Sequence, residues 1–352
     1  MPFNDSFNPR SNSLNALRLL LATSVVVSHS WQIGGYGAQP SFGGVTLGVW
    51  GVYGFFAISG FLITRSRLSG RPVAGFYWAR LLRIYPGFVV CIFLVAFVFA
   101  PVSAAISSGS SYNFSSGLSY FLRNIPLYAP VLSQEGIGNT LAAAPYAGVW
   151  NGPLWTLFFE AACYVLIGVA ASLITRKLLP GAVAALFGGG TAVMLAHLTF
   201  GLPLPQLVDD TLPLVIAFLA GAVLFLCGDK VRLRPLTVIP AVAVLAAAGA
   251  FGLAPAFAGL PIAFLMLWLG NVLPLQRVGS THDISYGIYI YGAPLQQMLY
   301  IAFPQAPLVV YIVLSLALVF VIAFLSSRFV EEPALRFKSR VPFGQSKVAV
   351  SA

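Results

Sequence analysis

Residues 14–32 read LNALRLLLATSVVVSHSWQ, an apolar stretch that contains one arginine, Arg18, and one histidine, His29. About 20 mostly apolar residues suffice for a helix to cross a lipid bilayer. Ionisable residues inside such a helix are expensive, and by default they indicate a functional site. A cleavable signal peptide is excluded because Arg18 lies inside the stretch and no cleavage site of small residues follows it. The stretch therefore predicts a transmembrane helix that carries functional residues.

The composition of the whole chain extends this interpretation. Of 352 residues, 59% are hydrophobic and 8% are charged, and the mean hydropathy is +0.89. A soluble domain carries about 25% charged residues, so that class is excluded. Three cysteines are too few for a disulfide-rich secreted scaffold. All three lie in apolar stretches and are expected to be buried, and no paired Cys/His spacing predicts a metal site.

The hydrophobic pattern predicts an all-α polytopic membrane protein with ten transmembrane helices. The expected spans are 14–32, 45–64, 85–105, 152–175, 180–199, 212–227, 236–254, 258–275, 284–303 and 308–326. Basic residues collect in cytoplasmic loops. If the N-terminus is cytoplasmic, 17 of the 19 Lys and Arg residues lie on the cytoplasmic side. Of the other two, Arg123 lies outside and Arg18 lies within a span. Both termini are therefore expected in the cytoplasm.

This orientation also explains the net charge of +10 without a nucleic-acid partner. It divides the chain into a cytoplasmic tail at 1–13, a ten-helix domain at 14–327 and a second cytoplasmic tail at 328–352. No internal repeat and no soluble domain is evident. The external segment 106–151 is long enough to suggest a function of its own, and either a re-entrant or surface-lying piece or an unstructured loop fits it.

Three of the ionisable residues inside the predicted spans allow both a functional and a structural interpretation. Arg18 and His29 are eleven residues apart, about 16 Å along a helix and on nearly the same face. They suit a lined cavity, although Arg18 could instead snorkel to the interface and His29 could be a packing residue. Glu160 is the only carboxylate deep in a span. It would pair with Arg18, orient His29, or serve a purely structural pair.

Other polar positions also allow a structural or a functional role. Ser59-Gly60 permits close helix approach, or lines the cavity. Arg80 and Arg83 share one helical face at the cytoplasmic rim. This arrangement suits phosphate recognition, or it simply follows the rule that basic residues collect on the cytoplasmic side. His282 and Asp283 precede the ninth span and are expected to cap it. His197 has no acidic neighbour in sequence and is expected to be structural, and Asp209 and Asp210 are expected in a solvated loop.

Five motifs occur in a fixed order along the chain. They are Arg18-x10-His29, Gly54-Phe-Phe-x-x-Ser59-Gly60, Arg80-x-x-Arg83-Ile-Tyr85-Pro86, Leu154-Trp-Thr-Leu-x-x-Glu160 and Ser285-Tyr-Gly-Ile-Tyr-Ile. Together they resemble the acyltransferase-3 family of integral membrane acyltransferases over nearly the whole chain. The resemblance implies a ten-helix core in the bacterial cytoplasmic membrane. It also implies transfer of an acyl group, usually acetyl, from acyl-coenzyme A to a hydroxyl of an envelope or exported glycan.

The resemblance assigns roles to the catalytic and donor-binding candidates. Arg18 and His29 match the essential pair of the family, and Arg80 and Arg83 match its cytoplasmic arginine pair. His29 would act as general base or as a transient acyl acceptor, and the sequence does not separate these mechanisms. Glu160 would set its tautomer or stabilise its charge. Ser59 and Tyr85 complete the expected binding residues for acetyl-CoA, the donor.

The remaining expectations concern the acceptor and its partners. Tyr146, Trp150 and Trp155 lie near the external mouth and are expected to stack on a sugar. Many relatives carry a histidine where this chain has Gly292, which places more weight on His29. The C-terminal tail is short and cytoplasmic, so the helical core or a separate protein must complete the transfer. Separate machinery would polymerise or export the glycan.

The competing function is a transporter or flippase for a glycan or a lipid-linked intermediate. Ten spans, an intramembrane carboxylate and many helix-breaking glycines and prolines favour it. The absence of internal repeats, which are common in transporters, argues against it.

Overall fold

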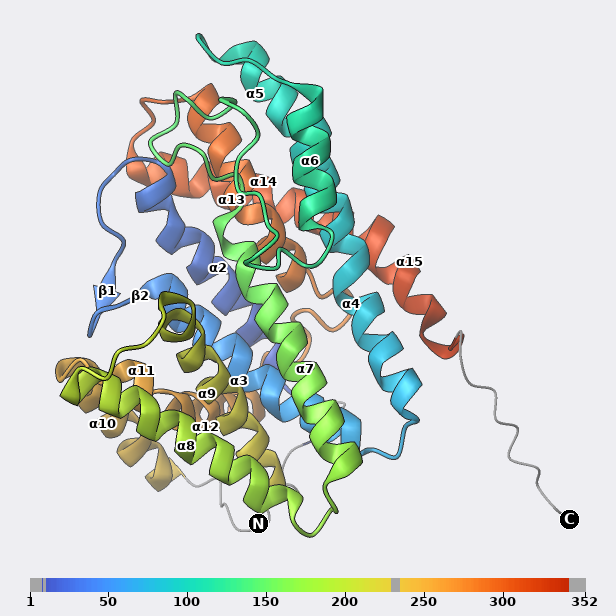
Figure 1. Cartoon of the computed structure of the whole chain (residues 1–352), viewed down its shortest axis with the longest axis vertical. Coiled ribbons are helices and arrows are strands. Elements are labelled where there is room, and N and C mark those ends of the chain that lie inside the picture. The colour runs from blue at the N-terminus through green and yellow to red at the C-terminus, as the bar shows by residue number, and fades with distance from the viewer. Residues whose placement is uncertain (1–7, 9–10, 229–234, 342–352) are drawn as a thin grey trace, which may run out of the picture.

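The computed structural model describes residues 8, 11–228 and 235–341. The basic residues Arg10, Lys230, Arg232, Arg234 and Lys347, which contributed to the orientation argument, lie outside the described residues. Within them, the regular elements are helices apart from one small hairpin (Figure 1). In the hairpin β1 (Ser41–Phe42) pairs antiparallel with β2 (Val45–Thr46). Gly43 and Gly44 form its two-residue turn with φ of +62° and +76°, a conformation that favours glycine.

Six helical stretches of the described chain are long and apolar enough to cross a membrane. They are Leu47–Leu68, Val73–Ile106, Gly152–Leu173, Leu179–Phe200, Gln206–Leu226 and Leu308–Ser339. The other four predicted spans are also helical, as α2 (Leu14–Ile33), α10 (Pro235–Ala250), α11 and α12 (Ala254–Phe257 and Gly259–Val272) and α13 (Ser285–Ala302). The protein is thus an all-α, multi-pass membrane protein, with α10 and α12 as short apolar helices.

The third predicted span is longer than the sequence suggested. The helix begins at Val73, not near residue 85, and runs as α4 (Val73–Leu94), a π-helical turn (Val95–Phe99) and α5 (Ala100–Ile106). Much of the predicted cytoplasmic loop is therefore helical. Arg80 and Arg83 lie on α4 itself, and both side chains are half-buried. The motif arginines consequently have positions fixed by a long, rigid helix.

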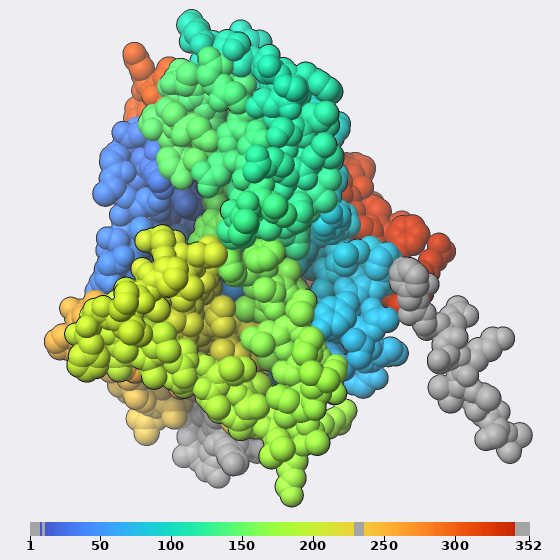
Figure 2. All heavy atoms as spheres, viewed as in Figure 1, coloured from blue at the N-terminus to red at the C-terminus, as the bar shows by residue number. Residues whose placement is uncertain are grey.

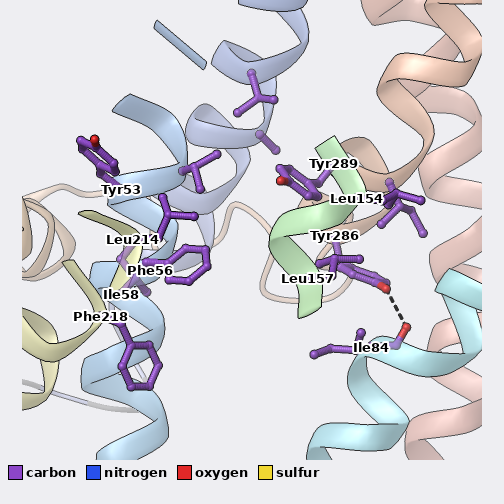
Figure 3. Close-up of a cluster of buried hydrophobic side chains, with 14 of the residues drawn as sticks. Tyr53, Phe56, Ile58, Ile84, Leu154, Leu157, Leu214, Phe218, Tyr286 and Tyr289 are labelled. Carbon is purple, nitrogen blue, oxygen red and sulfur yellow. Dashed lines mark hydrogen bonds between the residues drawn. The ribbon is translucent and has the colours of Figure 1, made fainter. Parts of the chain in front are cut away.

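Two central helices organise the bundle. Most residues of α13 are buried from Ser285 to Gln297, so this helix is enclosed on all sides. The other central helix, α3 (Leu47–Leu68), packs closely against α9 (Gln206–Leu226). A Cβ built on Gly60 would lie 1.9 Å from the carbonyl oxygen of Phe218, so only glycine fits. The predicted close approach at Ser59-Gly60 is confirmed, and Figure 3 shows Phe218 beside α3.

The external segment is folded, with a surface-lying helix. This helix, α6 (Phe114–Asn124), begins at Asn113, whose side chain accepts hydrogen bonds from the first backbone amides. It lies along α4 and α5 (Figure 1), and the rings of Phe114 and Phe121 pack on that of Phe97 at 5.7 and 5.9 Å between centroids. Of the two interpretations of this segment, the structure therefore supports the re-entrant or surface-lying piece over an unstructured loop.

Candidate active site

A cavity of about 590 Å³ lies where the external segment meets the helices. Its lining comes from α2, α3, α9, α13, the helix α7 (Trp155–Leu173) and the helix α8 (Leu179–Phe200). Figure 2 shows a hollow at this place, between the green external segment, the yellow α8–α9 corner and the blue N-terminal helices. His29, Tyr146 and Trp155 line this cavity, so three candidates far apart in sequence share one site.

Buried amides on the central helix hold the external segment over this cavity. Gln297 of α13 donates its Nε2 to the carbonyls of Tyr146 and Val149, at 2.8 and 2.9 Å. Asn151 donates its Nδ2 to the carbonyl of Ile290 at 2.8 Å. All donors and acceptors here are buried or half-buried, so replacing them leaves unsatisfied groups. The cavity wall formed by Tyr146 is consequently fixed to α13.

His29 lies on the wall of the cavity that α2 provides. Its ring is half-buried, and within the described part of the chain it has no hydrogen-bond partner. A Cβ built on Gly48 would lie 3.8 Å from Nε2 of His29, so the imidazole faces the first turn of α3. A helix N-terminus carries a partial positive charge, which favours negative charge beside it. The imidazole therefore has no hydrogen-bond partner among the described residues and lies beside the N-terminus of α3.

Glu160 contacts neither Arg18 nor His29 through a hydrogen bond. Its Oε1 accepts hydrogen bonds from the Ser59 hydroxyl at 2.8 Å and from the Tyr164 hydroxyl at 2.5 Å. These bonds join α3 to α7 in the middle of the bundle. Ser59, predicted for donor binding, is thus engaged with Glu160. A direct role of Glu160 on the imidazole has no hydrogen bond in this structure to support it.

At the end of the bundle predicted to be cytoplasmic, one carboxylate joins two of the motif arginines. Asp283 accepts from Nη1 of Arg18 at 2.7 Å, and the same oxygen accepts a short hydrogen bond from Arg83. Its other oxygen accepts from the amide and hydroxyl of Ser285, the first residue of α13, at 3.2 and 2.6 Å, so Asp283 contributes to the start of the helix, whereas His282, predicted to cap it as well, pairs with Glu332. Burial alone would raise the pKa of Asp283, but the two guanidinium groups hold it well below its usual value.

Arg80 differs from its motif partner Arg83. Its Nε is buried without a hydrogen-bond partner, and no carboxylate within the described residues forms an ion pair with it. Nearby Tyr85 is half-buried, with its ring centroid 6.3 Å from that of Phe88. Arg83 and Arg18 therefore have a protein anion as counterion, whereas Arg80 has none among the described residues.

The three predicted aromatic residues separate into two groups. Tyr146 and Trp155 line the cavity, and burial and the nearby Glu135 raise the pKa of the Tyr146 phenol, which therefore remains a hydrogen-bond donor. Trp150 is fully buried inside the external segment, and its Nε1 donates to Thr140 at 3.0 Å. Its ring does not line the cavity, so the expected stacking on a sugar has no surface to use there.

A second imidazole corrects the expectation for the α8–α9 corner. Nε2 of His197 lies 3.3 Å from Oδ1 of Asp209, and its Nδ1 lies 2.6 Å from the carbonyl oxygen of Leu202. His197 therefore has an acidic neighbour, and both residues line the cavity together with Asp210. Asp209 and Asp210 lie in the first turns of α9 and not in the predicted loop, and twelve positions separate Asp209 from His197, so no sequence spacing indicates the pair.

Four residues that hold the site together were not assigned to it from the sequence. Gln297, Asn151 and Tyr164 hold the cavity wall and the buried carboxylate, while Asp283 was expected only as a cap. Motif spacing does not reveal them, because each acts on a partner in another helix or segment. One signal was available: a buried amide or carboxylate requires a partner. In the described part of the chain, no cluster of three His, Cys, Asp or Glu side chains could hold a metal.

Comparison with known proteins identifies relatives over most of the chain. Residues 11–328 match the acyltransferase-3 family, described as "Acyltransferase domain". The O-acetyl transferase of Shigella phage Sf6 is 27% identical over 311 residues, which are 82% of this chain and 86% of that protein. Nodulation protein 10 of Rhizobium leguminosarum bv. viciae is 28% identical over 206 residues, 56% of this chain and 54% of that protein. No solved structure matches the chain significantly.

Proposed function

The chain belongs to the acyltransferase-3 family of membrane O-acyltransferases, and on this premise we propose that it transfers an acetyl group from cytoplasmic acetyl-CoA to a hydroxyl of a cell-surface or exported glycan. The observation that carries the proposal is His29, which faces a cavity of about 590 Å³ with no hydrogen-bond partner in the described chain. An imidazole of this kind is available to take a proton from an acceptor hydroxyl. The name of the phage relative, an O-acetyl transferase, favours acetyl as the group transferred.

The proposed topology has ten helices across the bacterial cytoplasmic membrane, with both termini in the cytoplasm. Helices occupy all ten predicted positions, and the distribution of Lys and Arg supports this orientation. Arg80 and Arg83 then lie at the cytoplasmic face, where acetyl-CoA is available. The cavity that contains His29 opens toward the outside, where the glycan is found.

Donor binding begins at the arginines. Arg80 has no protein counterion among the described residues and would bind the diphosphate of acetyl-CoA, while Arg83 and Arg18 are held beside it by Asp283. The pantetheine arm would then pass along α2 toward the cavity. Arg18 and His29 are separated by eleven residues, about 16 Å of helical rise. This length is comparable to that of the arm, so the thioester reaches His29.

In the transfer step His29 acts as the general base. Its free nitrogen accepts the proton of the acceptor hydroxyl, and the hydroxyl oxygen attacks the thioester carbonyl carbon. The resulting oxyanion lies near the N-terminus of α3, whose dipole stabilises it. The carbon–sulfur bond then breaks, and the departing thiolate takes the proton from the imidazolium. The products are the acetyl ester and free coenzyme A.

The cavity lining supports an uncharged, hydroxyl-rich acceptor. Glu135, Asp209 and Asp210 line it, and none of the described lining residues is Lys or Arg. Carboxylates accept hydrogen bonds from sugar hydroxyls, while they repel an anionic acceptor. Tyr146 and Trp155 add aromatic surface for a sugar ring. The acceptor would come from separate machinery that makes or exports the glycan.

The test is release of coenzyme A by the purified full chain in liposomes, with acetyl-CoA labelled on the acetyl group. His29→Ala is expected to reduce turnover by about 10²–10⁴-fold, the usual contribution of a general base. His282→Ala is the matched control because His282 pairs with Glu332 at the other end of the bundle. Equal turnover in native protein and His29→Ala would refute the role of His29. A folded native protein that neither binds nor turns over acetyl-CoA would refute the enzyme assignment in favour of a transporter.

A further inference from the structure

A group of basic side chains surrounds Arg80 at the cytoplasmic end. The charges of Arg71 and Arg83 act on Arg80, and Lys338 lies within electrostatic range of all three. Arg71 precedes α4, whereas Lys338 comes from the short 3₁₀ helix Arg336–Ser339 near the C-terminal end of the described chain. Residues more than 250 positions apart therefore bring like charges together.

Specific contacts hold the C-terminal segment against α4. The indole Nε1 of Trp78 donates to the carbonyl of Phe337 at 3.0 Å, next to Lys338 in sequence. Figure 1 shows α15 (Glu332–Leu335), which leads into this segment, beside α4. Trp78 lies two residues before Arg80 on α4. The position of Lys338 is thus set by packing and is not that of a free tail.

The charges of this group are only partly compensated. Asp283 neutralises part of the charge of Arg18 and Arg83. Arg71 and Lys338 are exposed, and neither forms an ion pair with a carboxylate in the described part of the protein. Gathering like charges costs free energy that an anionic ligand would recover. The group therefore has the composition of a site for a multiply charged anion.

We propose that Arg71 and Lys338 bind the 3′-phosphate of the adenosine of coenzyme A, outside the diphosphate that Arg80 binds. This inference rests on the proposed function, which supplies acetyl-CoA as donor. When the thioester of acetyl-CoA lies at His29, it is deepest in the bundle, the diphosphate follows, and the 3′-phosphate is outermost. The protein shows the same order, because Arg80 is partly buried whereas Arg71 and Lys338 are exposed.

The inference makes the C-terminal segment part of the donor site. A 3′-phosphate is a dianion at neutral pH, and two flexible or exposed cations beside it give charge-assisted hydrogen bonds. Such contacts are modest because solvent and salt screen them. Loss of either one is expected to weaken coenzyme A binding by about fivefold, and loss of both by more than tenfold.

The experiment measures equilibrium binding of radiolabelled coenzyme A and of 3′-dephospho-coenzyme A to the full chain in detergent. Native protein is expected to bind coenzyme A about tenfold more tightly or better. Lys338→Ala and Arg71→Ala are expected to weaken binding of coenzyme A alone, and Lys338→Arg to restore it. Arg336→Ala is the matched control, because side chains two residues apart on a 3₁₀ helix point in directions about 120° apart.

The possible contrary results have distinct meanings. Equal weakening for both ligands, or equal affinity of the native protein for them, would overturn the assignment of the 3′-phosphate while leaving donor binding intact. Native protein that binds neither ligand would overturn the proposed function as well. A thermal melt of each variant, followed by the exposure of buried Cys91 and Cys163 to a thiol-reactive dye, separates loss of fold from loss of the site.

Discussion

Replacement of Asp283 by Asn tests the charge arrangement at the cytoplasmic end most directly. In the native protein one carboxylate oxygen accepts hydrogen bonds from both Arg18 and Arg83. The substitution keeps the size and the acceptor oxygen but removes the negative charge. Two guanidinium groups then remain close together, partly buried and without a counterion.

The structure sets the size of the expected effect. Removing one partner of a buried ion pair costs about 3–5 kcal/mol. The side chains here are 17–22% exposed, so the lower end applies, about 3 kcal/mol. In equilibrium terms this is roughly a 150-fold loss of the folded state. At about 2 °C per kcal/mol, as for larger domains, Asp283→Asn should lower Tm by about 6 °C.

The thiol-dye melt described above measures this change. Asp210→Asn is the matched control, because it makes the same substitution at an exposed carboxylate whose one described hydrogen bond is to Gln206. Its Tm is expected to change by about 1 °C or less. Addition of Arg83→Gln to Asp283→Asn should recover part of the loss, because it removes one of the two uncompensated charges.

The titration of Asp283 itself should not change the effect in the working pH range. The folded-state pKa of Asp283 lies below its unfolded value of about 3.9. A lowered carboxyl pKa contributes stability above the unfolded pKa, and this is lost only as pH falls through the folded pKa. Between pH 5 and 8 Asp283 itself therefore adds no pH dependence, and any change of the Asp283→Asn deficit comes from Glu331, whose pKa burial raises to about 7 and whose charge acts on Arg83. The reasoning fails if Asp283→Asn melts with the native protein, or if Arg83→Gln lowers its Tm further.

Two further substitutions test the packing and the buried carboxylate in the same assay. Gly60→Ala forces a Cβ against the backbone of α9 and should lower the free energy of unfolding by about 1–3 kcal/mol or more. Gly188→Ala, with open space around it, should leave Tm equal or higher. The opposite ranking would contradict the packing argument. Glu160→Ala leaves the hydroxyls of Ser59 and Tyr164 without their acceptor and should lower the free energy of unfolding by about 1–3 kcal/mol. Glu160→Gln keeps an acceptor oxygen and should cost less stability. Equal losses of stability would show that the two hydrogen bonds contribute nothing specific.

The sequence predicted the positions of helices well because apolar length is a local property. All ten expected spans are helical, and the cap formed by Asp283 follows from its place just before α13. Helix ends were less predictable. The start of α4 at Val73 was missed because its first turns are partly polar and carry Arg80 and Arg83, which indicate a loop in a hydropathy pattern.

Contacts between distant segments were the part that the sequence could not supply. Arg18 and Asp283 are 265 residues apart, and Ser59 and Glu160 are 101 apart, so no spacing rule connects them. Sequence also does not show which way a ring faces. Trp150 and Trp155 looked equivalent near the external mouth, yet Trp150 is buried against Thr140 and only Trp155 lines the cavity.

The contact between α2 and α13 determines how accurately the two ends of the donor can be placed. Gly292 of α13 packs so closely on α2 that a Cβ there would lie 2.9 Å from Val26, and Gln296 donates to the Val26 carbonyl at 2.9 Å. Val26 lies one turn from His29, while Asp283 ties Arg18 to the start of α13. The same helix pair therefore fixes His29, the proposed base, and Arg18 at the other end of α2. Small misplacements of reacting groups cost large factors in rate. Because Gly292 has no side chain, α13 can approach α2 closely, and this contact helps to hold His29 in position.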